Sequence, residues 1–345
     1  MTTRYDAAVS ARVGIIGASG YTGAELLRLL AGHPDLEVVA ATAETHAGTP
    51  AASLYPHLAA AYPDLVFGPT TPEVGRGLDL VFLAMPHGAS QALVPGLLSE
   101  VKHVVDLAAD FRLKDPAAYP RWYGEEHTLP HLLATSVHGI PELYRSEMPG
   151  ASLIAAAGCY VTAASLALAP LVRSGAVEDH GIIVDAASGV SGAGRSLRDS
   201  SHFNTVDEDF TAYGLLDHRH TPEIEQAIGA QILFTPHLAP MNRGILATCY
   251  ARPTSPAVDP LALLADAYDG EPFVVVSERS PSTKATLGSN SVHVTARRDP
   301  RTGWVMAIAA LDNLTKGASG QAIQCANLAL GLPETAGLPV VGVYP

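Results

Sequence analysis

The sequence predicts an α/β protein, with an N-terminal doubly wound parallel (Rossmann-type) sheet and a following α+β domain whose sheet is mixed and largely antiparallel. Three observations support this. Short apolar runs alternate with helical segments over the first hundred-odd residues. A glycine-spaced turn, Gly17-x-x-Gly20-x-x-Gly23, joins the first run to the first helical segment. From about residue 160 onward, strand-like runs follow one another with few helices between them.

The elements of the first part follow in order. Residues 11–16 are a β-rich run, and the helix after the glycine turn ends at Gly32-His33-Pro34. The remaining strands are expected at residues 36–42, 79–84, 101–107 and 152–155, with helices at 24–31 and 89–99. Strands that alternate with helices in this way pair in parallel.

The second part has a different pattern. Strands are expected at residues 181–187, 231–236, 244–252, 272–277, 291–297 and 304–311, and helices at 162–171, 221–228, 260–268 and 313–330. Consecutive strands without helices between them favour antiparallel pairing. We expect a boundary near residue 158, with a dinucleotide-binding domain (1–158) before a catalytic, substrate-binding and oligomerisation domain (159–312).

Length, composition and charge limit the classes of function. A chain of 345 residues with 48% hydrophobic and 16% charged residues is globular and too long for one ordinary core. A net charge of −13 argues against a nucleic-acid partner, because phosphate backbones are bound by clustered Lys and Arg. Small anionic ligands remain compatible, since one local Arg outweighs distant surface charge. A broad, strand-rich second domain favours a homo-oligomer.

Cysteine usage and the N-terminus indicate a cytoplasmic protein. Three scattered cysteines are too few for a disulfide framework or a zinc site, and we expect no metal. Residues 1–8 contain no apolar signal segment. Residues 150–172 carry no formal charge and are long enough to cross a bilayer, but Pro170 and the Gly158 turn interrupt them. We expect a soluble strand–turn–helix there and no membrane partner.

The glycine turn fits a dinucleotide site, because it directly follows a strand and opens a helix. Glycines let the backbone reach the pyrophosphate, which sits on the helix N-terminus. A turn with incidental glycines is the plain alternative. The residues expected to bind the cofactor here are Gly17, Ser19, Gly20, Tyr21, Thr22 and Gly23.

The end of the second strand favours NADP. An NAD site usually has an acidic residue at this strand tip to bind the ribose 2′-hydroxyl. This chain instead has Thr42 and Thr45, whose hydroxyls can receive a 2′-phosphate. Glu44 lies close enough to weaken the argument, and no adjacent Arg settles it.

Cys159 is the candidate nucleophile. It lies in Ala-Gly-Cys-Tyr-Val-Thr (157–162), after an apolar run and before an Ala/Leu-rich stretch. The order predicts a strand, a turn at Gly158 and the first turn of a helix. We expect the helix N–H groups and dipole to lower the pKa of the thiol there. An inert buried cysteine is the alternative, and the commoner fate of free cysteines.

Two histidines supply the candidate acid and base. His218 and His220 flank Arg219 just before a helix marked by Thr221 and Pro222. Imidazole titrates near neutrality and suits proton transfer opposite a thiolate. A metal site and a plain surface loop are the rival interpretations, but no further ligand cluster completes a metal site.

Two arginines are candidates for anion binding. The glycine-rich loop 188–194 ends at Arg195 and offers exposed N–H groups. Arg112 follows a sheet strand, at the carboxyl edge where α/β sites form. A flexible loop and a surface ion pair are the plain alternatives.

Taken together, these motifs resemble those of the N-acetyl-γ-glutamyl-phosphate reductase family, the arginine-pathway branch of the aspartate-semialdehyde-dehydrogenase-like group. The resemblance covers nearly the whole chain. It is carried by the segments 17–23, 83–88, 106–113, 139–143, 158–162, 191–195, 218–224, 243–248 and 312–318. One departure is Ala157, where the family usually has Pro before Gly-Cys.

The resemblance implies a mechanism and further site residues. Cys159 attacks an acyl phosphate to give a thioester, NADPH supplies hydride, and His220 moves protons. The resemblance adds His218 and Arg112 as substrate ligands, although the two histidines can exchange roles. Arg195 and the loop before it receive phosphate or cofactor. Further cofactor residues are Pro86, Ser191, Gly192 and Asn313, and segment 313–345 is expected to return to the first domain.

Two alternatives stay open. A carrier-protein-linked aminoadipyl-phosphate reductase of lysine biosynthesis shares the chemistry, but typically has Asn-Ala-Thr after Gly-Cys and lacks the Ser-Gly-Ala-Gly-Arg loop. This chain has Tyr160-Val161-Thr162 and keeps the loop. A non-catalytic NADP-binding regulator on the same fold needs neither the thiol nor the imidazole pair.

Overall fold

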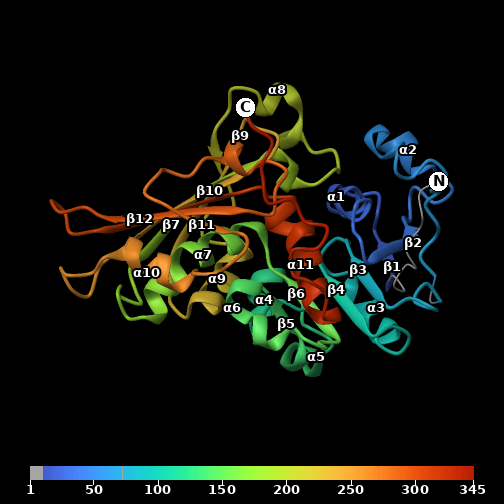
Figure 1. The fold of residues 1–345 in the computed structure, drawn as a ribbon, viewed down its shortest axis with the longest axis horizontal. Coiled ribbons are helices and arrows are strands. Elements are labelled where there is room, and N and C mark those ends of the chain that lie inside the picture. Colours follow the sequence, from blue (N-terminus) through green and yellow to red (C-terminus); the bar gives the residue numbers. More distant parts are fainter. Residues whose placement is uncertain (1–10, 72) are drawn as a thin grey trace, which may run out of the picture. The chain divides into compact units, whose positions relative to one another are not determined.

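The computed structural model describes residues 11–71 and 73–345, so residues 1–8, where the sequence shows no signal segment, lie outside the described residues. The chain forms two compact units (Figure 1). Unit 1 consists of Met1–Phe111, Ala134–Ala156 and Ser319–Leu338. Unit 2 consists of Arg112–Leu133, Ala157–Ala318 and Pro339–Pro345. Across the described part of the chain, no helix has the length and apolarity needed to cross a membrane.

Unit 1 is built on a six-stranded parallel sheet with strand order β2-β1-β3-β4-β6-β5. The strands are β1 (Ala11–Ile16), β2 (Leu36–Thr42), β3 (Leu80–Leu83), β4 (His103–Asp106), β5 (Val137–Gly139) and β6 (Leu153–Ala156). Every residue of β3 and β4 is buried, as expected for parallel strands covered on both faces.

The helices of unit 1 cover both faces of this sheet. The β1–α1–β2 and β3–α3–β4 crossovers run in opposite directions along the sheet, so right-handed connections place α1 (Tyr21–Leu30) and α3 (Ser90–Leu97) on opposite faces. The late helix α11 (Gly320–Leu330) packs with α1 and against β4, β5 and β6. The doubly wound sheet predicted from the sequence is confirmed.

Unit 2 contains a seven-stranded mixed sheet, also as predicted, with order β11-β12-β13-β10-β7-β9-β8. Its strands are β7 (Ile182–Gly189), β8 (Thr211–Ala212), β9 (Ile232–Ala239), β10 (Ile245–Ala251), β11 (Val274–Val276), β12 (Val292–Arg298) and β13 (Val305–Leu311). The β7–β9 and β11–β12 pairs are parallel and the other pairs are antiparallel.

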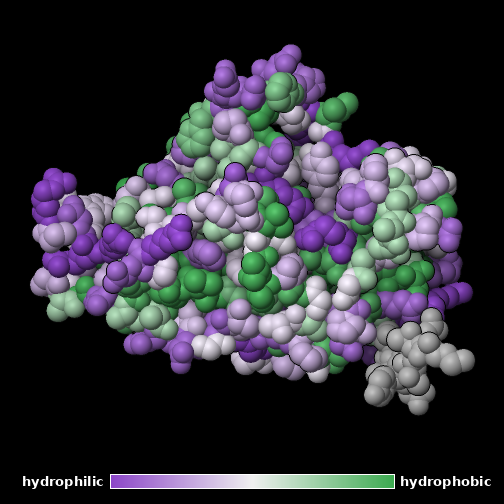
Figure 2. Space-filling model, turned by 45° about the horizontal axis from the view of Figure 1, so that its top comes forward, coloured by the Kyte–Doolittle hydropathy of each residue, from purple (hydrophilic) through white to green (hydrophobic). Residues whose placement is uncertain are grey.

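Helices cover one face of this second sheet. The helices α7 (Cys159–Arg173), α9 (His220–Ile228) and α10 (Pro260–Ala267) pack on it and on one another. Inward-facing residues of β7, β10 and β13 are buried, and the alternate residues on the opposite face are partly exposed. Exposed apolar side chains also gather in residues 197–216 around α8 (Phe203–Val206), at the top of Figure 2.

Several boundaries differ from the sequence prediction. The helices α1 and α7 begin at Tyr21 and Cys159, three residues earlier than expected, because Gly20 and Gly158 serve as their extended N-caps. The short strand β5 was not predicted. The closing segment divides: residues 313–318 belong to unit 2, 319–338 to unit 1, and 339–345 to unit 2.

Candidate active site

Cys159 is the first residue of α7, directly after the extended N-cap Gly158. The turn at Gly158 separates it from β6; the residue as a whole is partly exposed, but its sulfur lies in a largely desolvated position. Gly317, in the π-helical turn Thr315–Ser319, approaches from another segment of unit 2. A Cβ at Gly317 would lie 2.8 Å from the Cβ of Cys159, so only glycine allows this approach.

The electrostatic environment keeps Cys159 protonated in the resting protein. Burial raises the pKa of the thiol to about 11, against the smaller lowering effects of the Tyr160 backbone N–H and the Arg112 charge. The expectation of a lowered thiol pKa was therefore wrong. The helix N-terminus acts in the expected direction, but desolvation of the charged form is larger.

His220 lies directly against the turn that precedes the thiol. Its Nε2 occupies the space that a Cβ on Gly158 would need, and its ring centroid is 5.9 Å from that of Tyr160. Burial lowers the pKa of His220 well below its ordinary value, with a further lowering by His218. The imidazole is therefore neutral at pH 7 and can accept a proton.

His218 forms the outer part of the same cluster. Its ring centroid is 4.8 Å from that of His220, and its Nδ1 accepts the backbone N–H of His220 at 3.1 Å. Aromatic rings of Tyr160, Tyr213 and Phe234 surround it at 5.3–5.7 Å. Burial, with a contribution from the Arg219 charge, lowers the pKa of His218 to about 4, so both imidazoles are neutral.

Arg112 joins this cluster through Glu223, a residue that sequence reasoning missed. Nη1 of Arg112 is 3.5 Å from Oε2 of Glu223, and Oε1 of Glu223 accepts the backbone N–H of Gly158 at 3.0 Å. Both side chains are buried. The sequence spacing could have indicated Glu223, because it follows His220 by three residues and therefore lies on the same face of the helix.

A second group of predicted residues lies together at the start of the 188–195 loop. Nδ2 of Asn313 donates to Oγ of Ser191 at 3.0 Å, and its Oδ1 accepts the N–H of Gly244 at 2.7 Å. A Cβ on Gly192 would lie 3.8 Å from Nδ2 of Asn313. Arg195 is exposed farther along this loop.

The glycine turn of unit 1 has the backbone geometry that a dinucleotide site needs. Gly17 has φ +84°, and a Cβ there would lie 2.5 Å from the backbone oxygen of Ala84. A Cβ on Gly23 would lie 2.5 Å from Cα of Ala18. No side chain caps α1 and its first turn has no acidic residue, so its N–H groups fit a pyrophosphate.

The other predicted cofactor residues of unit 1 have varied surroundings. The backbone oxygen of Ser19 accepts the Tyr55 hydroxyl at 2.7 Å, and that of Thr22 accepts the Ser319 hydroxyl at 2.8 Å. Thr42 is buried, with its hydroxyl 2.9 Å from that of Thr70. Of the remaining four, Gly20 is the extended N-cap of α1, and Tyr21, Thr45 and Pro86 are exposed.

Asp110 is a second residue that sequence reasoning missed. It is fully buried and fixes the loop after β3, accepting the backbone N–H groups of Gly88 and Ser90 at 2.7 and 2.9 Å. Its Oδ1 is also 2.8 Å from Nδ1 of His87. Although burial acts in the opposite direction, the hydrogen bonds from His87, Ser90 and Gly88 lower the pKa of Asp110 to about 2.

A metal was the rival interpretation of the histidine pair. Over residues 11–71 and 73–345, no group of three or more His, Cys, Asp or Glu side chains is placed to hold a metal ion. The side chains that this cluster in unit 2 brings together are a thiol, two neutral imidazoles, a carboxylate and a guanidinium.

Both parts of the chain match families of known proteins. Residues 12–151 match the family model described as semialdehyde dehydrogenase, NAD binding domain, and residues 159–313 match semialdehyde dehydrogenase, dimerisation domain. The N-acetyl-gamma-glutamyl-phosphate reductase of Symbiobacterium thermophilum is 50% identical, over 97% of this chain and 99% of that protein. The protein of the same name from Acidothermus cellulolyticus is 50% identical, over 98% and 100%.

Solved structures share the fold. A probable aspartate-semialdehyde dehydrogenase from Pseudomonas aeruginosa superposes with a TM-score of 0.67 at 19% identity, over 92% of this chain and 98% of that chain. Aspartate semialdehyde dehydrogenase with NADP from Candida albicans gives a TM-score of 0.65 at 14% identity, over the same shares.

Asp110→Asn is expected to reduce stability in a pH-dependent way. The pKa of Asp110 is lowered from 3.8 to about 2 in the folded protein, so its contribution is present above pH 4 and is lost as pH falls toward 2. At pH 7 the variant should lose about 2 kcal/mol of unfolding free energy. In denaturant unfolding at pH 7, 5, 4 and 3, the difference in unfolding free energy between Asp110→Asn and wild type should shrink as the pH falls. The control Asp64→Asn, at an exposed position, should have the same unfolding free energy as wild type at each pH. A pH-independent difference would contradict this account.

Gly158→Ala is expected to disrupt the site without affecting unit 1. The added Cβ would overlap the imidazole of His220, which must shift away from the turn. If His220 exchanges a proton with Cys159 from this position, activity should fall roughly 100-fold. NADP affinity, measured by titration, should stay within about twofold, and unchanged turnover would show that His220 need not lie there.

Proposed function

Because this chain belongs to the N-acetyl-gamma-glutamyl-phosphate reductase family of semialdehyde dehydrogenases, we propose that it reduces N-acetyl-γ-glutamyl phosphate to N-acetylglutamate semialdehyde and phosphate, a step of arginine biosynthesis. The reductant is NADPH, held by the glycine turn and the N-terminus of α1. The observation that supports this chemistry best is the packing of a neutral imidazole, His220, on the turn before a protonated thiol, Cys159.

In the first half-reaction, His220 accepts the thiol proton while the sulfur of Cys159 attacks the acyl carbon. The carbon–sulfur bond forms and the carbon–oxygen bond to phosphate breaks, which gives a thioester and inorganic phosphate. Arg112 balances negative charge on the phosphate, and the first N–H groups of α7 stabilise the sulfur anion. His218 fixes the backbone at His220 by accepting its N–H, and its ring packs against the His220 ring.

In the second half-reaction the thioester is reduced. NADPH, when bound, supplies the hydride that this step needs. After hydride addition the negatively charged oxygen re-forms its double bond to carbon and the carbon–sulfur bond breaks. The protonated His220 returns its proton to the departing sulfur, which regenerates the Cys159 thiol as the aldehyde leaves. The Ser191–Asn313 pair and Arg195 serve the phosphate or cofactor.

The lysine-pathway reaction on a carrier protein remains the second candidate for substrate. A net charge of −13 disfavours an acidic carrier, whereas a small anion needs only a local cation. Incubating the protein with free N-acetylglutamate semialdehyde, NADP and phosphate, and following absorbance of NADPH, tests the proposal. NADPH formation with free semialdehyde supports the arginine-pathway reaction, and its absence despite NADP binding would contradict it.

Cys159→Ser is expected to abolish turnover while NADP binding persists. Serine is a far weaker nucleophile at neutral pH, so kcat should fall by roughly 10³-fold or more. Nucleotide affinity and the thermal midpoint should stay close to wild type. Substantial activity in the serine variant would exclude the thioester route, and loss of nucleotide binding as well would indicate misfolding instead.

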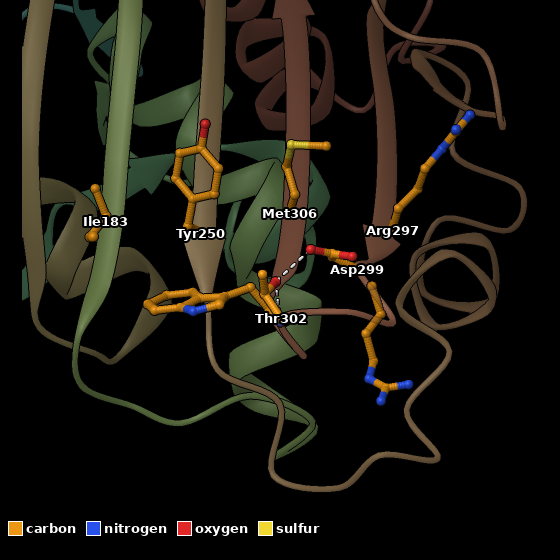
Figure 3. A pocket seen from close by; sticks show the side chains of 8 residues that line it. Ile183, Tyr250, Arg297, Asp299, Thr302 and Met306 are labelled. Atoms are coloured by element: carbon orange, nitrogen blue, oxygen red, sulfur yellow. Dashed lines mark hydrogen bonds between the residues drawn. The ribbon is translucent and has the colours of Figure 1, made fainter.

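We also propose that the homo-oligomer forms through the uncovered face of the unit 2 sheet. Ile183, Tyr250 and Met306 lie opposite one another on β7, β10 and β13 and face away from α7 (Figure 3). Together with Trp304 they line a hollow of about 630 Å³. Arg297, Arg298, Asp299 and Thr302 complete its lining, and an uncovered sheet face that carries apolar side chains can serve as a subunit contact. The whole sheet lies within residues matched by the dimerisation-domain model, which favours a second copy as the occupant.

Tyr250→Lys is expected to weaken this self-association. A charge placed on the apolar face must be desolvated when two copies pack together. Sedimentation velocity at low micromolar concentration should show a shift from dimer or larger species toward monomer. Ala262→Lys, on the exposed side of α10, is the matched control and should leave the mass unchanged. Equal association of both variants would place the contact elsewhere.

A further inference from the structure

A buried carboxylate connects three segments of the active site in unit 2. Oε1 of Glu223 holds the N–H of Gly158, the residue before the nucleophile, at 3.0 Å. Its Oε2 is 3.5 Å from the Arg112 guanidinium. Glu223 also lies one helical turn after His220 on α9. Its side chain is 0% exposed and that of Arg112 is 9% exposed, so this anion and cation interact away from bulk water.

A neighbouring residue fixes the backbone of the Arg112 segment independently. Gln226, one turn farther along α9, donates through Nε2 to the backbone oxygen of Arg112 at 2.9 Å. Its Oε1 accepts the N–H of Lys114 at 2.7 Å. Gln226 already anchors the backbone of the Arg112 segment. Glu223 therefore holds the Arg112 guanidinium in place and offsets its positive charge, and it does not set the course of this backbone.

The charges of this pair have opposite effects on the reacting groups. The negative charge of Glu223 raises the pKa values of Cys159 and His220, and the positive charge of Arg112 lowers both. These charge effects are smaller than that of burial. The titratable and charged groups around the two reacting residues are Arg112, Tyr160, Tyr213, His218, Arg219 and Glu223.

We propose that Glu223 is a positioning residue that fixes the Gly158 turn and the Arg112 guanidinium relative to each other, and whose negative charge offsets that of Arg112 beside Cys159 until substrate binds. The acyl phosphate is an anion, so when it binds it competes with Glu223 for the Arg112 guanidinium. The guanidinium can then interact with the substrate. The inference rests on the proposed role of Cys159 as nucleophile.

Alkylation of Cys159 by iodoacetamide, without substrate, tests this directly. Cys249 and Cys325 are fully buried, so the labelled Cys159 peptide can be quantified by mass spectrometry. Glu223→Gln keeps an oxygen acceptor for Gly158 but removes the charge. Between pH 7 and 9 its alkylation rate should exceed that of wild type by about threefold, because more thiolate is present at each pH. Its kcat should fall.

Two further variants separate charge from packing. Glu223→Ala removes both the charge and the acceptor for Gly158, so its kcat should fall further than that of Glu223→Gln. Glu225→Gln, which removes a charge from the same helix, should match wild type. An unchanged alkylation rate in Glu223→Gln, or equal kcat values in Glu223→Gln and Glu223→Ala, overturns the proposal.

The alkylation readout does not depend on the reaction assigned to the protein. If Cys159→Ser kept its activity, the proposed function would fail while the Glu223 variants could still change thiol reactivity. If Cys159→Ser were inactive and Glu223→Gln behaved as wild type in alkylation, only the positioning role would fail.

Discussion

Burial of the Cys159 sulfur and the His220 imidazole is the constraint on which the rest of the site depends. Because desolvation disfavours every charged form, both groups are neutral before reaction. Moving the proton from sulfur to nitrogen therefore creates an ion pair in a poorly solvated place. The N-terminus of α7, Arg112 and Glu223 are the groups that can stabilise that pair, and each lies on a different segment of unit 2.

Close backbone approach is the second common feature, and both units achieve it with glycine. In unit 2, Gly158 leaves room for His220 and Gly317 leaves room for Cys159. In unit 1, Gly17 allows contact with Ala84 and Gly23 allows contact with Ala18. At each position a single methyl group would collide with a neighbour. The close approach of the reacting and binding groups therefore requires glycine at these positions.

Much of the architecture could be predicted from the sequence, because long apolar runs and the glycine turn are local signals. The three-residue strand β5 escaped prediction because its pairing depends on β6, which lies later in the chain. Glu223 and Asp110 also escaped, since a buried carboxylate is recognised by the donors around it and not by its sequence neighbours. The thiol pKa was predicted with the wrong sign for a related reason: the helix dipole follows from sequence, but the extent of desolvation does not.

The division of the chain between the two units has a consequence for biosynthesis. The sheet of unit 1 is complete by residue 156, yet α11, which packs on β4, β5 and β6, is among the last elements to be made. During translation, this apolar sheet surface stays uncovered until nearly the entire polypeptide, α11 included, has left the ribosome. Collapsed intermediates with such exposed surfaces tend to associate. Residues 1–158 expressed alone would lack α11, so the surface of the sheet that this helix covers would stay exposed.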